Sequence, residues 1–225
     1  GDCVKTWGKV GSGEGEFDRP SGLAFDANDN LYMVDSLNHR IQVFTKDGMF
    51  LSTWGQKGTG DGEFDHPWGI EIDKKGDVYI ADWRNDRIQK FTADGQFLMK
   101  FGSSGQDDGE FSRPTSIAVD NDGIIYVTDF KNDRLQVFDA DGGFVTKLLG
   151  EATLSKWGRE RVALDPTMLR GREMAQGLEE REKLFQGPIA VEVDDEGRVF
   201  VVESTRHRLQ VFRKQPSIFQ GGLLG

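Results

Sequence analysis

The chain has 225 residues, with 38 Asp and Glu against 28 Lys and Arg and a formal net charge of -10 at pH 7. This length is sufficient for one domain with a substantial buried core. An acidic chain lacks the positive field that non-specific binding to nucleic acid or anionic lipid requires. Cys3 is the only cysteine, which excludes a disulfide within the chain. No apolar run approaches the roughly 20 residues of a membrane-spanning helix.

The first predicted element is an isolated strand. Residues 1–8 read GDCVKTWG and align with residues 48–55, GMFLSTWG. The segment 20–55 contains four short apolar runs, SGLAFD, LYMVD, RIQVF and MFLSTWG, separated by turns rich in Asp, Asn and Gly. Such runs between turn residues predict short antiparallel strands. The segment 20–55 is therefore predicted to be a four-stranded meander, and residues 1–8 match only its outer strand.

The same pattern recurs along the chain. Pro20, Pro67 and Pro114 are spaced by 47 residues, and Pro188 follows Pro114 after 74 residues. The repeats span about 20–55, 67–102, 114–150 and 188–212, and the last one ends after RLQVF, because residues 215–222 make a poor outer strand. Four strands per repeat at this period are typical of a β-propeller. The prediction is an all-β propeller with four blades of antiparallel strands in this chain.

The repeat also resembles a known family. Each of the first three copies contains D-x-x-x-x-R-[IL]-Q-x-F after its proline, with the Asp–Arg pairs Asp35/Arg40, Asp82/Arg87 and Asp129/Arg134. The fourth copy has Glu203 for the Asp and keeps RLQVF at 208–212. This pattern resembles the NHL repeat of six-bladed propellers. The resemblance implies a six-bladed ring, a role as an interaction platform and, in some relatives, binding of single-stranded RNA.

Two arrangements of the ends follow from these observations. In the first, CVKTW of the segment 1–8 completes the 188–212 blade, and the ring closes with four blades, which removes an exposed sheet edge. In the second, residues 1–8 are the outer strand of a further blade, and the ring is open or is completed elsewhere. The six-bladed norm of the family is the reason for considering the second, and the sequence leaves both arrangements open.

The segment 151–187, between the third repeat and the fourth, is an insertion that makes this linker 27 residues longer than the others (74 minus 47). It is rich in Ala, Leu, Glu, Arg and Met, which are good helix formers. Asp165-Pro166 is typical of a helix start, and residues 167–184 are predicted to form one or two helices. Such an insertion is either a binding element or an inert flap on the rim of the propeller.

The repeated residues are interpreted as scaffold. A catalytic group is needed once, whereas the Asp–Arg pair occurs in every blade, where a bidentate ion pair is expected across the hairpin. The glycines of GSGEGEF and GTGDGEF permit a turning linker, and no helix follows them as phosphate binding requires. No G-x-S-x-G motif is present. The sequence therefore predicts no catalytic residue and no cofactor.

The alternative function is a metal-dependent lyase or hydrolase with a site in the propeller channel. Enzymes on similar propellers, such as the peptide-amidating lyases, hold zinc through histidines near the axis. His39, His66 and His207 are the only histidines, and a zinc site can in principle use all three. Nothing in their spacing demands it, so no metal ligand is predicted.

The residues that differ between repeats are the candidate binding site. In a meander the turn after the second strand and the linker before the proline emerge on the same face. Aromatic and Arg residues at those positions are the usual anchors of protein interfaces. The alternative to a binding role is a structural one, in which Trp68 and Trp83 pack between neighbouring blades. The predicted partner-binding residues are Arg19, Trp68, Trp83, Arg84, Arg113, Phe130 and Lys131.

The function predicted from these residues is a non-catalytic propeller that binds a protein partner or serves as a subunit of a larger assembly. RNA binding on the same basic face is a variant, which the overall acidity disfavours. No membrane span and no cofactor are expected.

Overall fold

A computed structural model describes residues 2–151, 163–174 and 178–214. The strands form where the apolar runs predict them, and each run of four is an antiparallel meander. The blades are blade 1, β1 (Pro20–Phe25), β2 (Leu31–Asp35), β3 (Arg40–Phe44) and β4 (Phe50–Trp54); blade 2, β5 (Pro67–Ile72), β6 (Val78–Asp82), β7 (Arg87–Phe91) and β8 (Phe97–Phe101); blade 3, β9 (Pro114–Val119), β10 (Ile125–Asp129), β11 (Arg134–Phe138) and β12 (Phe144–Leu148); and blade 4, β13 (Pro188–Val193), β14 (Arg198–Glu203) and β15 (Arg208–Arg213).

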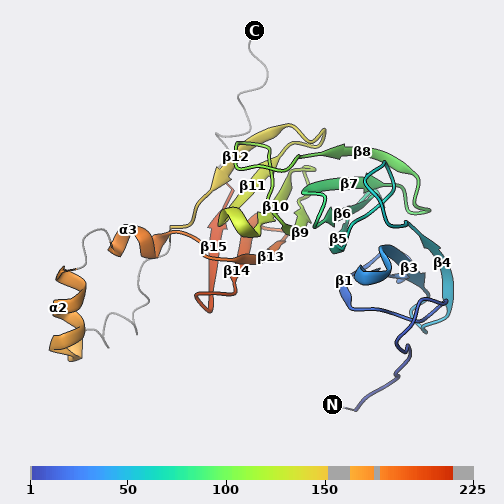
Figure 1. Ribbon diagram of the computed structural model, residues 1–225, viewed down its shortest axis with the longest axis horizontal. Coiled ribbons are helices and arrows are strands. Elements are labelled where there is room, and N and C mark those ends of the chain that lie inside the picture. The colour runs from blue at the N-terminus through green and yellow to red at the C-terminus, as the bar shows by residue number, and fades with distance from the viewer. Residues whose placement is uncertain (1, 152–162, 175–177, 215–225) are drawn as a thin grey trace, which may run out of the picture.

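The blades follow one another around an arc, from blade 1 in blue to blade 4 in red (Figure 1). Contacts join the innermost strands in the order β1, β5, β9 and β13. These strands approach closely at Gly69, where a Cβ atom would collide with the carbonyl oxygen of Thr115. The predicted all-β propeller with four blades is therefore confirmed.

The apolar core lies between blades. One cluster joins blades 1 and 2 through Val34, Ile41 and Ile80, and equivalent clusters join blades 2 and 3 and blades 3 and 4. Blades 2 and 3 thus bury one apolar face against the blade before them and the other against the blade after them, whereas blades 1 and 4 each bury one face in this way. We call these the backward and forward faces, and the propeller is held by burial of both.

The repeated Asp and Arg are scaffold. Arg87 Nε donates to Asp82 Oδ2 at 2.9 Å, and its terminal nitrogens donate to the carbonyl oxygens of Thr59, Gly60 and Glu63 in the linker. Blades 1 and 3 repeat this arrangement. The expected bidentate pair is wrong for these three blades, because the linker carbonyls take the remaining donors. Only Arg208 in blade 4 reaches both carboxylate oxygens, those of Glu203.

Closure of the ring by residues 1–8 is not what the structure shows. The described residues of blade 4 form a three-stranded sheet, and residues 2–9 form no strand. The segment lies instead against blade 1, where the Trp7 ring covers Gly48. Trp54 covers Gly95 in the same way, so Trp7 lies where the outer strand of a preceding blade would place it. The predicted poor outer strand at 215–222 lies outside the described residues.

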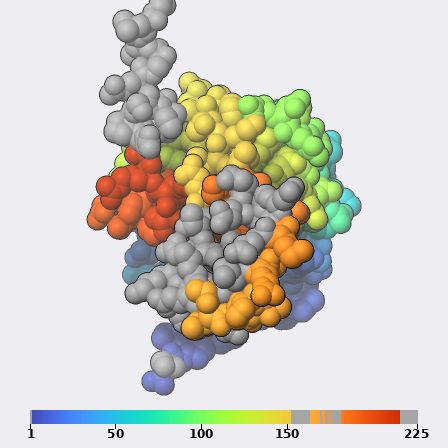
Figure 2. Space-filling view, turned by 90° about the vertical axis from the view of Figure 1, so that its left-hand side faces the viewer, coloured from blue at the N-terminus to red at the C-terminus, as the bar shows by residue number. Residues whose placement is uncertain are grey.

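The insertion contains the helices α2 (Pro166–Met174) and α3 (Leu178–Lys183). The backbone N–H groups of Thr167 and Met168 donate to Asp165 Oδ1, which is the N-cap that the sequence indicates. Figure 1 shows α3 near blade 4 and α2 farther out from the blades, and Figure 2 shows both helices in orange from that side. Arg208 donates to the carbonyl oxygens of Glu182 and Leu184, so the end of the insertion replaces the linker of the other blades. None of the described helices is long and apolar enough to cross a membrane.

Candidate interaction face

One face of the propeller brings together the turn of each blade and the linker that precedes that blade. The backbone N–H of Arg84, after β6, donates to the carbonyl oxygen of Asp65 at 3.0 Å. Equivalent bonds join Leu37 to Asp18 and Lys131 to Ser112. The backbone thus brings each turn to the linker before its blade. Among the selected residues, Trp68 is the exception to these two positions, because it follows Pro67 at the start of β5.

Five of the selected residues lie together. The ring centroids of Trp68 and Trp83 are 6.2 Å apart, with an interplanar angle of 35°. The Arg19 guanidinium lies 5.4 Å from the Trp68 ring, and that of Arg113 lies 4.8 Å from the Trp83 ring. Arg84 also lies over Trp83, at 5.9 Å. We call Arg19, Trp68, Trp83, Arg84 and Arg113 the Trp–Arg cluster.

The Trp–Arg cluster is partly open to solvent. Trp68, Trp83 and Arg113 are half-buried, and Arg19 and Arg84 are exposed. Arg113 is held over Trp83 because its Nη1 donates to the carbonyl oxygen of Arg84 at 3.1 Å. The tryptophans are therefore neither walled in between sheets nor free, since each ring leaves surface available beside a cation. Cation–π contacts of this kind contribute about 0.5–1 kcal/mol at exposed sites.

Phe130 and Lys131 form a separate pair. The Lys131 ammonium lies 5.4 Å from the Phe130 ring. Phe130 is half-buried and points toward blade 4, where a Cβ atom added to Gly187 would meet its Cε2 at 3.2 Å. Phe130 therefore fills the junction of blades 3 and 4, and its turn equivalent Trp83 lies in the Trp–Arg cluster instead.

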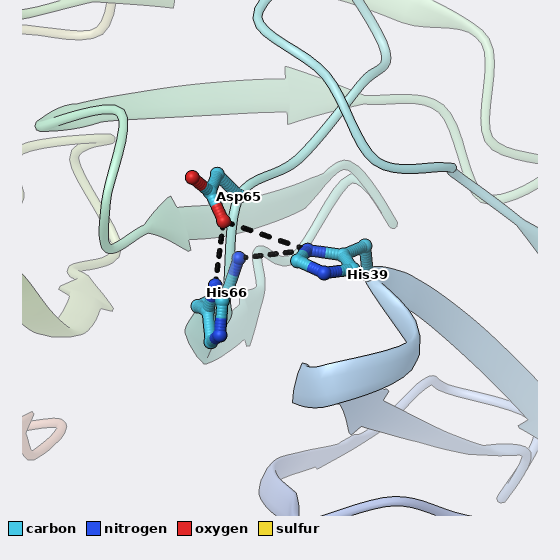
Figure 3. A group of neighbouring side chains, drawn as sticks. All are labelled: His39, Asp65 and His66. Carbon is cyan, nitrogen blue, oxygen red and sulfur yellow. Dashed lines mark hydrogen bonds and ion pairs between the residues drawn. The ribbon is translucent and has the colours of Figure 1, made fainter.

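Two of the three histidines meet at the junction of blades 1 and 2. His39 Nδ1 accepts a hydrogen bond from the backbone N–H of His66 at 3.0 Å, and the two rings are 4.8 Å apart. Asp65 Oδ1 lies 2.5 Å from His66 Nδ1 and 3.7 Å from His39 Nδ1 (Figure 3). His207 lies in the turn of blade 4, so the structure does not assemble the three histidines into one site.

His39 has a scaffold role that its equivalents define. Asp86 accepts the backbone N–H of Arg113 at 2.8 Å, and Asp133 accepts that of Gly187 at 2.7 Å. These bonds fasten each turn to the linker of the next blade, and we call them latches. Burial lowers the pKa of His39, with a further decrease from His66, so the ring is neutral and accepts the N–H. His39, Asp65 and His66 are residue types that zinc binds, and they lie close together. To bind a metal through Nδ1, His39 would have to give up its hydrogen bond to the backbone N–H of His66.

Sequence reasoning did not select Glu71. This half-buried residue of β5 stands where blades 1 and 3 have Ala24 and Ala118. The pKa of Glu71 is raised to about 8, mainly by burial and also by the carboxylates of Glu192 and Asp73. Glu192 occupies the equivalent position on β13, so two acidic residues interact from the innermost strands. The signal available in the sequence was the contrast of Glu with Ala at one repeat position.

Comparison with known families supports the repeat assignment. A family model described as a 6-bladed beta-propeller matches residues 15–90 and 74–154. A model of the NHL repeat matches residues 185–212. Together they cover all four blades.

Relatives with curated descriptions match over short stretches. Protein lin-41 of Caenorhabditis elegans is 45% identical over 49 residues, which are 22% of this chain and 4% of that protein. Protein brain tumor of Drosophila melanogaster is 46% identical over 44 residues, which are 20% of this chain and 4% of that protein. The chain thus spans a small part of the length of the relatives it matches.

Solved structures share the fold at low sequence identity. A Bacteroides thetaiotaomicron protein of unknown function has a TM-score of 0.59 and 22% identity, covering 86% of this chain and 47% of that chain. A catalytically inactive H270A virginiamycin B lyase from Staphylococcus aureus, solved with Quinupristin, has a TM-score of 0.53 and 15% identity, covering 87% of this chain and 56% of that chain. At these identities the likeness shows the propeller fold alone.

Proposed function

The chain belongs to the 6-bladed beta-propeller family and carries NHL repeats, and on that premise we propose that it is a non-catalytic platform that binds a protein partner through the Trp–Arg cluster. The observation that carries the proposal is the meeting of Trp68 and Trp83, 6.2 Å apart and flanked by Arg19 and Arg113. Trp and Arg are the residues that most often dominate the binding energy of interfaces. They occur here at positions that the repeat leaves free to vary.

The chemistry of the Trp–Arg cluster defines the partner. The cluster brings three guanidinium groups together on a chain of net charge -10, and that of Arg113 lies 3.8 Å from Asp86. The two indole rings add apolar area. The matching ligand is a polypeptide segment with carboxylates beside an aromatic or aliphatic side chain. Bidentate Arg–carboxylate pairing fixes the orientation of such a segment.

The test is capture of partners by the full chain, compared between the wild type and Trp83→Ala/Arg84→Ala. Proteins that bind through the cluster are retained by the wild type and lost by the double variant. The matched control is Lys46→Ala, an exposed residue of a turn between the third and fourth strands. For each protein identified by mass spectrometry, binding to purified variants is measured directly, and the double variant is expected to weaken binding at least about tenfold.

Circular dichroism of the double variant separates loss of binding from loss of folding. A folded double variant that retains every partner of the wild type contradicts the proposal. Enrichment of single-stranded RNA in place of protein, lost with the same two substitutions, assigns the face to RNA and also contradicts it.

A further inference from the structure

The junction of blades 1 and 2 differs from the other two junctions in the residues around its latch. The turn position is His39, and the two residues before the proline of the next blade are Asp65 and His66. The equivalent residues are Asp86, Ser112 and Arg113 at the next junction, and Asp133, Gln186 and Gly187 at the one after it. Of the three junctions, the first is therefore the one that combines two imidazoles with a carboxylate.

The scaffold does not require histidine at either position. A latch needs one side-chain acceptor in the turn, and Asp86 and Asp133 serve as that acceptor at the other two junctions. The donor is a backbone N–H, which Arg113 and Gly187 supply without an imidazole. The latch alone therefore does not account for two histidines at one junction.

The side chains of His39, Asp65 and His66 face one another (Figure 3). Asp65 Oδ1 lies 2.5 Å from His66 Nδ1 and 3.7 Å from His39 Nδ1, and one ligand atom of each residue lies within 4.8 Å of the others. Zinc binds nitrogen and oxygen at about 2.0–2.2 Å, so two ligand atoms of a tetrahedral site lie about 3.3 Å apart. The observed separations bracket this value, so small side-chain rotations bring the three atoms onto one ion.

Hydrogen bonds that involve none of these three side chains hold their backbone in place. The N–H of His39 donates to the carbonyl oxygen of Ser36 at 3.2 Å. The N–H of Asp65 donates to Asp82 Oδ1 at 2.8 Å. His39 is buried, and Asp65 and His66 are half-buried, so the group can be reached from solvent. A metal ion can thus enter a site whose backbone is already positioned.

We propose that His39, Asp65 and His66 bind one zinc ion, which joins blade 1 to blade 2 in place of the latch. His39 Nδ1 then binds zinc instead of accepting the N–H of His66. His66 carries its proton on Nε2, so that Nδ1, which is hydrogen-bonded to Asp65 here, binds zinc as well. Three metal–ligand bonds replace two hydrogen bonds, and water completes the coordination.

The donor set and the local charge specify the ion. Two imidazole ligands favour zinc over calcium and magnesium, which take oxygen ligands. The positive charges of Lys57 and Arg84 act on His39. The negative charge of Asp65 is therefore needed to hold a dication at this junction.

Isothermal titration calorimetry with zinc chloride tests this proposal on the full chain, after a chelator has removed any metal. The wild type is expected to bind one zinc ion per chain. His39→Asn keeps an oxygen acceptor for the latch, and His66→Arg introduces the residue found before Pro20 and Pro114, so both variants are chosen to keep the fold. Mutation of groups that merely support a metal ligand costs about 10–100-fold in affinity, so loss of a ligand is expected to weaken zinc binding at least about tenfold.

The controls are His207→Asn and Cys3→Ser, which are expected to keep the affinity of the wild type. His207 occupies the turn position of His39 in blade 4, and Cys3 is the only thiol in the chain. Circular dichroism reports whether each variant is folded. The three histidines also give a second readout by NMR of the wild type, in which zinc shifts the imidazole signals of His39 and His66 and leaves those of His207 in place.

Four results overturn the proposal. They are no saturable zinc binding by the wild type, full affinity in folded His39→Asn or His66→Arg, loss of affinity in a folded control, and a stoichiometry well above one, which assigns the zinc to scattered surface carboxylates. If a variant fails to fold, the NMR readout of the wild type decides, and unchanged imidazole signals of His39 and His66 contradict the site. None of the three ligands belongs to the Trp–Arg cluster and the test uses no partner, so this proposal and the proposed function fail independently.

Discussion

The junction between blades 1 and 2 and the junction between blades 2 and 3 share one backbone arrangement but carry different side chains. Both contain an acceptor in the left-handed conformation that bonds to the N–H before the next proline. The acceptor is His39 at the first junction and Asp86 at the second. The forward-facing residue of the inner strand is Ala24 at the first and Glu71 at the second. Repeated groups therefore hold the propeller, and groups that vary give each junction its own electrostatics.

The largest expected effect comes from breaking a group that both junctions share. In Asp82→Ala, Arg87 remains buried without its carboxylate, and the N–H of Asp65 loses its acceptor. Removal of one partner of a buried ion pair costs about 3–5 kcal/mol. Urea denaturation of the full chain is expected to show this loss in the free energy of unfolding. A loss below about 1 kcal/mol would mean that the repeated pair is not scaffold.

The second effect is the pH dependence of stability that Glu71 adds to the second junction and that Ala24 does not add to the first. The pKa of Glu71 in the folded chain is about 8, above its ordinary value of 4.5. Between these pH values the folded state binds more protons than the unfolded state, so the free energy of unfolding falls as the pH rises, by up to about 1.4 kcal/mol per pH unit. Glu71→Gln is expected to flatten this dependence in urea titrations between pH 5 and 8. An equal slope in both proteins contradicts the assignment.

The third effect concerns the latch itself. Asp86→Ala removes the acceptor of the Arg113 N–H and of the Ser104 hydroxyl, each at 2.8 Å. An unsatisfied buried donor costs about 1–3 kcal/mol. The control is Asp86→Asn, because Asn keeps an acceptor oxygen and tolerates the left-handed conformation. Equal losses of the free energy of unfolding in the two variants would show that the latch contributes nothing.

The smallest effect distinguishes the two latches by pH. The pKa of His39 is lowered below its ordinary value of 6.5, mainly by burial, while Asp65 opposes the shift and His66, Lys57 and Arg84 add to it. The unfolded chain therefore binds more protons below pH 6.5, and stability falls as the pH drops through that range. His39→Asn is expected to remove this part of the acid sensitivity, and Asp86→Asn is expected to leave it unchanged. Unchanged acid sensitivity in His39→Asn would be evidence against the histidine latch.

The repeat allowed much of this architecture to be predicted, because each blade is built from local runs and turns. The scaffold role of Asp82 and Arg87 followed from their recurrence. The contact of His39 with His66 did not, because it joins a turn of one blade to the linker of the next, and no local pattern encodes that packing. The place of residues 2–8 against blade 1 depended on the arrangement of the blades around the ring, which no single repeat specifies. Glu71 was missed because the repeats were compared at their turns and linkers, whereas the contrast of Glu71 with Ala24 and Ala118 lies within a strand.

The adjacent residues Asp82 and Trp83 allow the most direct test of the central claim, that repeated residues hold the fold and varied residues bind the partner. Partner affinity and the free energy of unfolding are measured on Trp83→Ala/Arg84→Ala and compared with the unfolding of Asp82→Ala. The account predicts at least about a tenfold loss of affinity in the double variant, with a much smaller loss of stability than Asp82→Ala shows. A double variant that keeps full affinity, or that is destabilised as much as Asp82→Ala, contradicts the account.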